Sequence, residues 1–93
     1  MKVLGEMQKL SRMLAGVEGV IRVIEGGYGL QKRLAYLGLR VGKTVKKIAS
    51  EPLKGPVVFG VDGTHVAIGR GVAEKILVEV LDENTFDGKP KRR

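Results

Sequence analysis

A glycine-containing stretch, GLRVGKT at residues 38–44, carries the residue types of a nucleotide-binding loop. In the P-loop signature G-x-x-x-x-G-K-[ST], backbone amides cradle phosphates while the lysine and the hydroxyl complete the site. Gly42, Lys43 and Thr44 match the end of this signature, but Gly38 stands one residue too close to them. The stretch is therefore either a degenerate phosphate-binding site or a turn whose sequence happens to be similar.

The surrounding pattern favours the turn. A P-loop joins a buried strand to the N-terminus of a helix, where the helix dipole and free amides hold the phosphates. Here a helical pattern precedes the glycines, and Lys43 and Thr44 open a strand pattern. The other glycine cluster, residues 26–29, does not complete G-x-G-x-x-G, because Lys32 occupies the place of the third glycine. We expect no nucleotide and no other cofactor at either stretch.

Residue types suited to catalysis or metal binding are sparse. His65 is the single histidine and cysteine is absent, so a metal site would need mostly oxygen ligands. His65 alternates with Val66 along a strand pattern, which predicts a solvent-facing side chain. Glu18 and Glu25 flank another strand pattern at an odd separation and should face opposite sides. We predict no catalytic residue, no metal ligand and no enzyme activity.

The chain has the length of one domain, with 93 residues of which 43% are hydrophobic and four are aromatic. Its core must therefore be aliphatic, and its 14 glycines indicate tight turns between short strands. The longest uncharged run has seven residues, whereas a membrane helix needs about twenty apolar residues. The N-terminus lacks the apolar segment of a secretory signal. We expect a soluble cytoplasmic protein.

Periodicity and turn residues predict five strands and one helix. The strands are expected at residues 17–24, 44–50, 57–61, 64–69 and 76–80. Asp62-Gly63 between two of them is typical of a type I′ hairpin turn, with Val57, Phe59 and Val61 on one face. A helix should begin after Gly29 and end at Gly38, because three leucines recur at helical spacing. We expect that stripe, which is Leu30, Leu34 and Leu37, to lie in the core, and residues 72–75 to form a single helical turn.

These elements predict a mainly β fold, a small and strongly bent barrel of about five strands with one inserted α-helix. The barrel domain is expected at residues 10–81. Residues 1–9 are predicted to form an N-terminal extension with Leu4 and Met7 in one helical turn. Residues 82–93 are predicted to form a mobile, polar and basic tail.

The net charge of +7 is unevenly distributed. Residues 1–50 carry ten Lys or Arg and three acidic residues, and the last six residues carry four Lys or Arg. Such a balance suits nucleic acid, anionic lipid or an acidic protein face. Nucleic-acid binding remains an alternative, although base-stacking platforms use exposed aromatics and this chain has few.

The order of the motifs resembles the ferrous iron transport protein A (FeoA) family over residues 10–80. The residues that carry the resemblance are Leu10-Ser11, Gly16, residues 20–24, Gly26-Gly27, Arg33-Leu34, Leu37-Gly38-Leu39, Gly42-Lys43-Thr44-Val45, residues 52–57, Ala73 and Ile76-Leu77-Val78. Lys43 and Lys54 depart from the pattern. The resemblance implies an SH3-like barrel that acts in the cytoplasm with a membrane ferrous iron transporter bearing a G-protein domain. It also implies an accessory or regulatory role rather than catalysis.

The chain is also similar to the C-terminal SH3-like domain of iron-dependent repressors, but it lacks their DNA-binding helix-turn-helix. A stand-alone module of this kind is the second alternative. Members of the FeoA family are described as associated with transition metals, yet this sequence offers no ligand set. Self-pairing of exposed strand edges into a homo-oligomer is left open.

A basic surface around the helix is the candidate site for a protein partner. Its predicted residues are Lys32, Arg33, Tyr36, Arg40, Lys43, Lys46 and Lys47. We expect it to bind an acidic face of the transporter's cytoplasmic, G-protein-bearing region. The groove between the helix and the loop at residues 52–56 is an alternative docking site.

Overall fold

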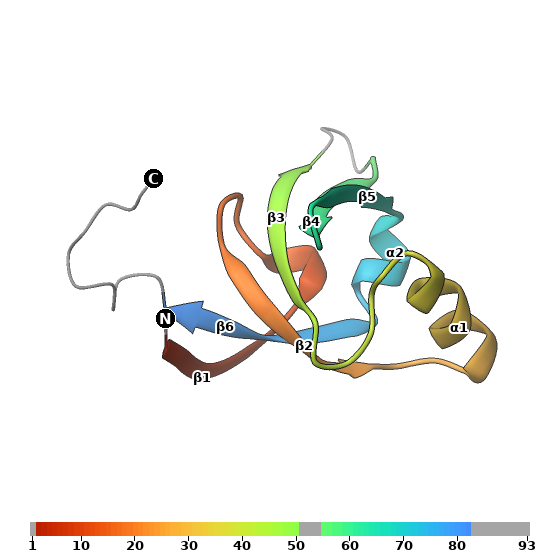
Figure 1. The fold of residues 1–93 in the computed structure, drawn as a ribbon, viewed down its shortest axis with the longest axis horizontal. Helices are drawn as coiled ribbons and strands as arrows, with labels where there is room; N and C mark the ends of the chain where they lie inside the picture. Colours follow the sequence, from red (N-terminus) through yellow and green to blue (C-terminus); the bar gives the residue numbers. More distant parts are fainter. Residues whose placement is uncertain (1, 51–54, 83–93) are drawn as a thin grey trace.

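A computed structural model of the protein describes residues 2–50 and 55–82, which form one six-stranded antiparallel sheet with short helices (Figure 1). The strands are β1 (Lys2–Lys9), β2 (Glu18–Ile24), β3 (Thr44–Ser50), β4 (Val57–Val61), β5 (Thr64–Ile68) and β6 (Ile76–Asp82). The helical elements are the 3₁₀ turn η1 (Leu10–Arg12), α1 (Tyr28–Tyr36) and α2 (Arg70–Ala73). The predicted mainly β, SH3-like fold is confirmed.

The sheet has the order β1-β6-β2-β3-β4-β5, so β6 returns from the end of the chain to lie between β1 and β2. The strongly bent sheet curls around the core, while the β1–β6 pair extends to one side and α1 lies at the opposite end (Figure 1). The edges of the sheet are β1 and β5. Within the described ranges, no helix is long and apolar enough to cross a membrane.

The strand β1 corrects the prediction of five strands and of a helical turn at Leu4 and Met7. It pairs with β6 in the register Met7↔Glu79 and Lys9↔Leu77, with a shift between Val3 and Met7. Gly5 lies in that irregularity with φ of 83°. The local sequence is polar and interrupted by glycine, and its partner strand is about 70 positions away, so the pairing leaves little local signal. The predicted tail begins at residue 82, but Asp82 is the last residue of β6 and pairs with Lys2. Residues 83–93 of that tail lie outside the described residues.

The predicted β4–β5 hairpin is confirmed. Val57, Phe59 and Val61 are buried, and Phe59 lies opposite Val66. Asp62 and Gly63 have φ of 52° and 81°, the two positive values that a type I′ turn requires. The hydroxyl of Thr64 donates to the Val61 carbonyl at 2.9 Å and closes the turn.

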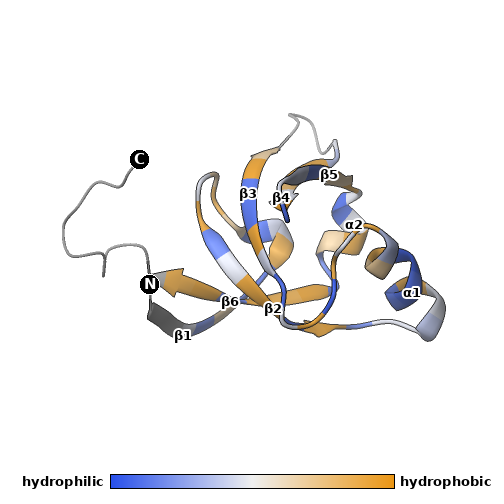
Figure 2. Ribbon diagram, in the orientation of Figure 1, coloured by the Kyte–Doolittle hydropathy of each residue, from blue (hydrophilic) through white to orange (hydrophobic). Residues whose placement is uncertain are grey.

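The core under the sheet is aliphatic apart from Phe59, as the composition predicts. Figure 2 shows hydrophobic colouring along most of β6. The fully buried large side chains are Phe59, Leu10, Met13, Ile21, Leu39, Ile76, Val45, Val57 and Val78. They come from β2, β3, β4, β6, η1 and the segments after η1 and α1, so the core joins both halves of the chain.

The helix α1 ends in a Schellman motif. The Gly38 amide donates to the Ala35 carbonyl and the Leu39 amide donates to the Leu34 carbonyl, both at 2.9 Å. Gly38 has φ of 90°, a conformation that glycine adopts without strain. The motif turns Leu39 into the core beside Leu34, and both side chains are buried.

The predicted leucine stripe needs one correction. Leu34 is buried and Leu30 is half-buried, but Leu37 is 45% exposed. The helix begins at Tyr28, two residues earlier than predicted, and it ends before Leu37. The Schellman turn then redirects the chain, so Leu39 enters the core and Leu37 remains at the surface.

Candidate functional site

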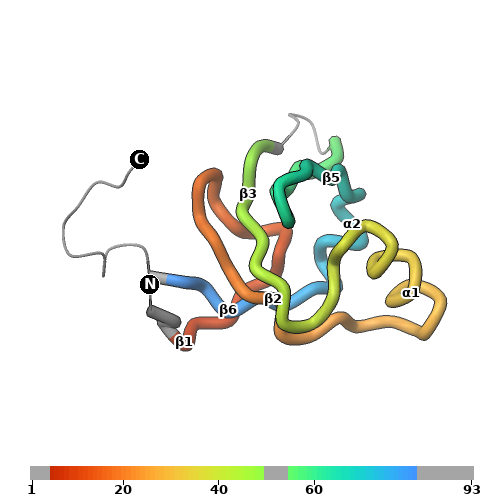
Figure 3. Tube along the Cα trace, viewed as in Figure 1, coloured from red at the N-terminus to blue at the C-terminus, as the bar shows by residue number. Residues whose placement is uncertain are grey.

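The stretch at residues 38–44 forms the corner between α1 and β3. The Lys43 amide donates to the Arg40 carbonyl at 3.0 Å, and Gly42 at the third position has φ of 96°, as a type II turn requires. Two further backbone bonds fix the corner to β2: Gly42 donates to Ile21 at 2.7 Å and Ile21 donates to Lys43 at 2.8 Å. Figure 3 follows the chain from α1 through this corner into β3. The helix precedes the glycines, which is the reverse of a P-loop.

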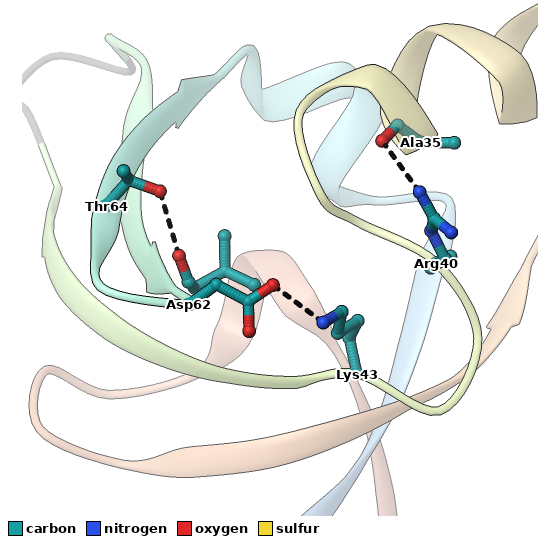
Figure 4. A network of polar contacts seen from close by, with 6 residues as sticks. Ala35, Arg40, Lys43, Asp62 and Thr64 are labelled. Atoms are coloured by element: carbon teal, nitrogen blue, oxygen red, sulfur yellow. Dashed lines mark hydrogen bonds and ion pairs between the residues drawn. The ribbon is translucent and has the colours of Figure 1, made fainter.

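Lys43 is already paired within the protein. Its Nζ atom donates to Oδ2 of Asp62 at 2.6 Å, which joins the corner to the β4–β5 turn (Figure 4). The lysine that would face a phosphate in a P-loop is therefore bound to a carboxylate. Lys43 stays near the predicted surface, but its charge is largely compensated.

The predicted partner-binding set needs a correction at Lys47, which is buried. On β3 its side chain shares the inward face with Val45, and only 5% of the residue is exposed. Its Nζ atom donates to the Met13 carbonyl at 2.6 Å and lies 5.9 Å from the centre of the Phe59 ring. Burial, together with the nearby Arg70 charge, lowers the pKa of Lys47. This lysine anchors the segment after η1 and is not part of a docking surface.

Lys46 points to the outer face of β3, away from the buried neighbours Val45 and Lys47. The strand registers place Glu18, Lys46, Gly60 and His65 in one row across four strands. The row lines an open groove of about 310 Å³ beside the β4–β5 turn. His65 is exposed, as predicted. Lys46 therefore belongs to a different surface from α1.

The remaining predicted residues lie together on and after α1, along with three apolar or aromatic side chains that were not predicted. We call this set the α1 surface: Tyr28, Lys32, Arg33, Tyr36, Leu37, Arg40 and Val41. Tyr28 is 79% exposed, Tyr36 84% and Val41 59%. The Nζ atom of Lys32 lies 5.8 Å from the centre of the Tyr28 ring, one helical turn away. If the helix had been predicted to start after Gly27, the four-residue spacing of Tyr28 and Lys32 would have placed Tyr28 on the predicted surface.

The charge on the α1 surface is not compensated locally. Residues 26–50 contain six Lys or Arg and no Asp or Glu. Lys43 is paired and Lys47 is buried, whereas no carboxylate of the described residues forms an ion pair with Lys32, Arg33 or Arg40. The result is a positive surface that also exposes aromatic and aliphatic groups.

A small pocket lies within the α1 surface. Its lining residues are Lys32, Ala35, Tyr36 and Arg40, and its volume is about 190 Å³. The guanidinium of Arg40 donates through Nη2 to the Ala35 carbonyl at 3.4 Å (Figure 4). Arginine and tyrosine around a partly apolar pocket are the residue types that contribute most to protein–protein binding. Across the described part of the chain, no three His, Cys, Asp or Glu side chains gather as a metal site would require.

Comparison with known proteins identifies a protein family that matches most of this chain. A family model described as the FeoA domain matches residues 8–80. A protein of Methanocaldococcus jannaschii, provisionally described as Fe(2+) transport protein A, is 37% identical over 73 residues, which cover 78% of this chain and 87% of that protein.

A second relative combines two proteins in one chain. It is the Fe(2+) transport protein A/Fe(2+) transporter FeoB fusion protein of Porphyromonas gingivalis, 33% identical over 76 residues. The match covers 82% of this chain and 9% of the fusion protein.

Solved structures agree on the fold. A crystal structure described as iron uptake regulatory protein (FeoA) has a TM-score of 0.77 and 34% sequence identity, with 82% of this chain and 100% of that chain covered. A manganese-dependent transcriptional repressor has a TM-score of 0.73 at 19% identity, with 83% of this chain and 43% of that chain covered. The second likeness concerns the fold alone.

Proposed function

The chain belongs to the FeoA domain family, and from this premise we propose that it is an accessory component of ferrous iron transport that binds the membrane transporter. In this proposal it acts from the cytoplasmic side and contacts the transporter's G-protein-bearing region. The α1 surface makes the contact, and the chain itself performs no chemistry on the ion.

The observation that carries the proposal is the fusion relative. There, a segment similar to this chain and the transporter FeoB are parts of one polypeptide. Covalent linkage of two modules raises their effective concentration and favours pairs that act together. A separate chain of the same family needs a surface that provides the affinity otherwise supplied by the linkage.

The α1 surface has the composition that such a contact needs. Exposed Tyr28 and Tyr36 offer large rigid contact areas, and Lys32, Arg33 and Arg40 provide uncompensated positive charge. Cations of this kind increase the association rate with an acidic protein face and weaken binding as salt rises. The transporter region is therefore expected to present acidic residues.

The test is the affinity of this chain for the cytoplasmic domain of the transporter from the same organism. A Lys32→Glu/Arg33→Glu variant should bind at least about tenfold more weakly at low salt, because two attractive charges become repulsive. Lys43 is left unchanged, since reversing its charge would also repel Asp62. The matched control is Arg12→Glu on η1, an exposed basic residue outside the α1 surface. Equal affinities for wild type and both variants would refute the proposal.

A second candidate function follows from the same exposed tyrosines. Aromatic side chains beside cations can stack on the bases of single-stranded nucleic acid. Titration with single-stranded RNA and DNA at two salt concentrations separates the candidates. Micromolar binding of RNA or DNA, with an affinity that falls steeply as salt rises, would favour the nucleic-acid function. The transporter domain should compete with nucleic acid only if both ligands bind the α1 surface.

A further inference from the structure

The pocket on the α1 surface has the size of a side chain. Its volume of about 190 Å³ is several times the share of one water molecule, about 30 Å³. It is below the range of about 300–1,000 Å³ that is usual for small-molecule sites. The pocket therefore suits one side chain of a partner better than a nucleotide or another free metabolite.

Arg40 lines the pocket and contacts the end of α1. One of its five N–H donors is used on the Ala35 carbonyl, which lies in the last turn of α1 and also accepts from the Gly38 amide. The guanidinium therefore lies near the negative end of the helix dipole. Further N–H groups remain for a second acceptor, and a guanidinium fork matches the two oxygens of a carboxylate.

The other walls support the same ligand. Lys32 lies one turn before Tyr36 and supplies a second cation, while Ala35 and the Tyr36 ring supply apolar surface. The carboxylate of an Asp or Glu side chain could pair with both cations while the methylene groups of that side chain pack on the Tyr36 ring. Phosphate would satisfy the charges but would leave the apolar walls without a partner.

We propose that this pocket receives one Asp or Glu side chain from an acidic segment of the docking partner, with Arg40 as a bidentate receptor and Lys32 as a second cation. This inference rests on the proposed function, because it names the chemistry by which the α1 surface recognises the transporter. It adds a specific site to what would otherwise be general charge attraction.

Charge-conserving variants test this site. With the transporter's cytoplasmic domain as the probe, Arg40→Lys should weaken binding about tenfold, because lysine keeps the charge and loses the fork. The matched control Arg12→Lys makes the same change on η1, outside the α1 surface, and should bind within about twofold of wild type. Wild-type affinity in Arg40→Lys, together with weak binding by Lys32→Glu/Arg33→Glu, would overturn the pocket and leave the docking proposal intact. Unchanged binding in every variant would overturn both.

The partner's side of the contact is found by changing each Asp or Glu of the probe domain to Asn or Gln. One substitution should weaken binding of the wild-type chain about tenfold and have little further effect on Arg40→Lys. This coupling separates direct recognition from a change in the fold of the Arg40→Lys variant. If no single carboxylate couples to Arg40, the proposed site is wrong.

Discussion

Lys43 and Lys47 both belong to the basic stretch at residues 26–50, yet the structure commits each of them internally. Lys43 is bound to Asp62 on the β4–β5 turn, and Lys47 is bound to the Met13 carbonyl inside the protein. The net charge of a sequence segment therefore overstates the charge that a partner meets. Lys32, Arg33 and Arg40 are the residues of this stretch that supply the positive charge of the α1 surface.

The buried position of Lys47 predicts a pH dependence of stability. Its pKa lies below 10.5 in the folded protein because burial disfavours the charged form. Between the lowered pKa and 10.5 the unfolded chain binds more protons, so the free energy of unfolding should rise with pH in that window. Lys47→Met removes the titrating group, and wild type should gain stability relative to this variant as the pH rises toward 10.5.

Urea unfolding at several pH values measures that gain. Lys46→Met, which removes the exposed neighbouring lysine, serves as the control and should follow wild type across the series. Parallel stability curves for wild type and Lys47→Met would show that Lys47 keeps an ordinary pKa in the fold.

At the scale of elements, α1 is defined by glycines at both ends. Gly27 precedes its first residue, and Gly38 closes it with a positive φ. One buried side chain, Leu34, and the half-buried Leu30 attach the helix to the rest of the protein. The conformation of the α1 surface therefore depends strongly on how the helix is terminated.

Two alanine substitutions in this element should have opposite effects. Gly38→Ala should destabilise the protein by about 1 kcal/mol or more, because an L-residue is strained at φ of 90°. Gly29→Ala should stabilise it by about 0.5–1 kcal/mol, since the site is within the helix and, apart from its chain neighbours and the helix backbone, no atom lies within 4 Å of the added Cβ. Denaturant unfolding of both variants measures the effects, and a Gly38→Ala variant as stable as wild type would contradict the Schellman termination.

The same elements show what the sequence could predict. The β4–β5 hairpin and the end of α1 were predictable because Asp62-Gly63 and Gly38 act locally. The strand β1 was not, because its pairing with β6 is decided by contacts far along the chain. Leu37 was assigned to the core because it continues the helical spacing of Leu30 and Leu34, but the Schellman turn redirects the chain there and leaves Leu37 at the surface.

At the scale of the whole molecule, the sequence predicted part of the candidate site. Lys32, Arg33, Tyr36 and Arg40 do share one surface, since they lie on one helix and the turn that follows it. Lys46 and Lys47 were grouped with them as basic residues that follow closely in the sequence, but β3 directs them to opposite faces. The pocket was beyond prediction, since it depends on the contact between Arg40 and the end of α1.

The measurement that tests the central claim most directly is an NMR titration of the labelled chain with the transporter's cytoplasmic domain. Amide signals of residues 28–41 should shift or broaden most, and raising the salt concentration should reverse the effect. Signals of η1 and of the β1–β6 pair should change little. Perturbations centred on the groove beside His65, or no perturbation at a domain concentration that saturates a micromolar complex, would contradict the claim that this protein acts through its α1 surface.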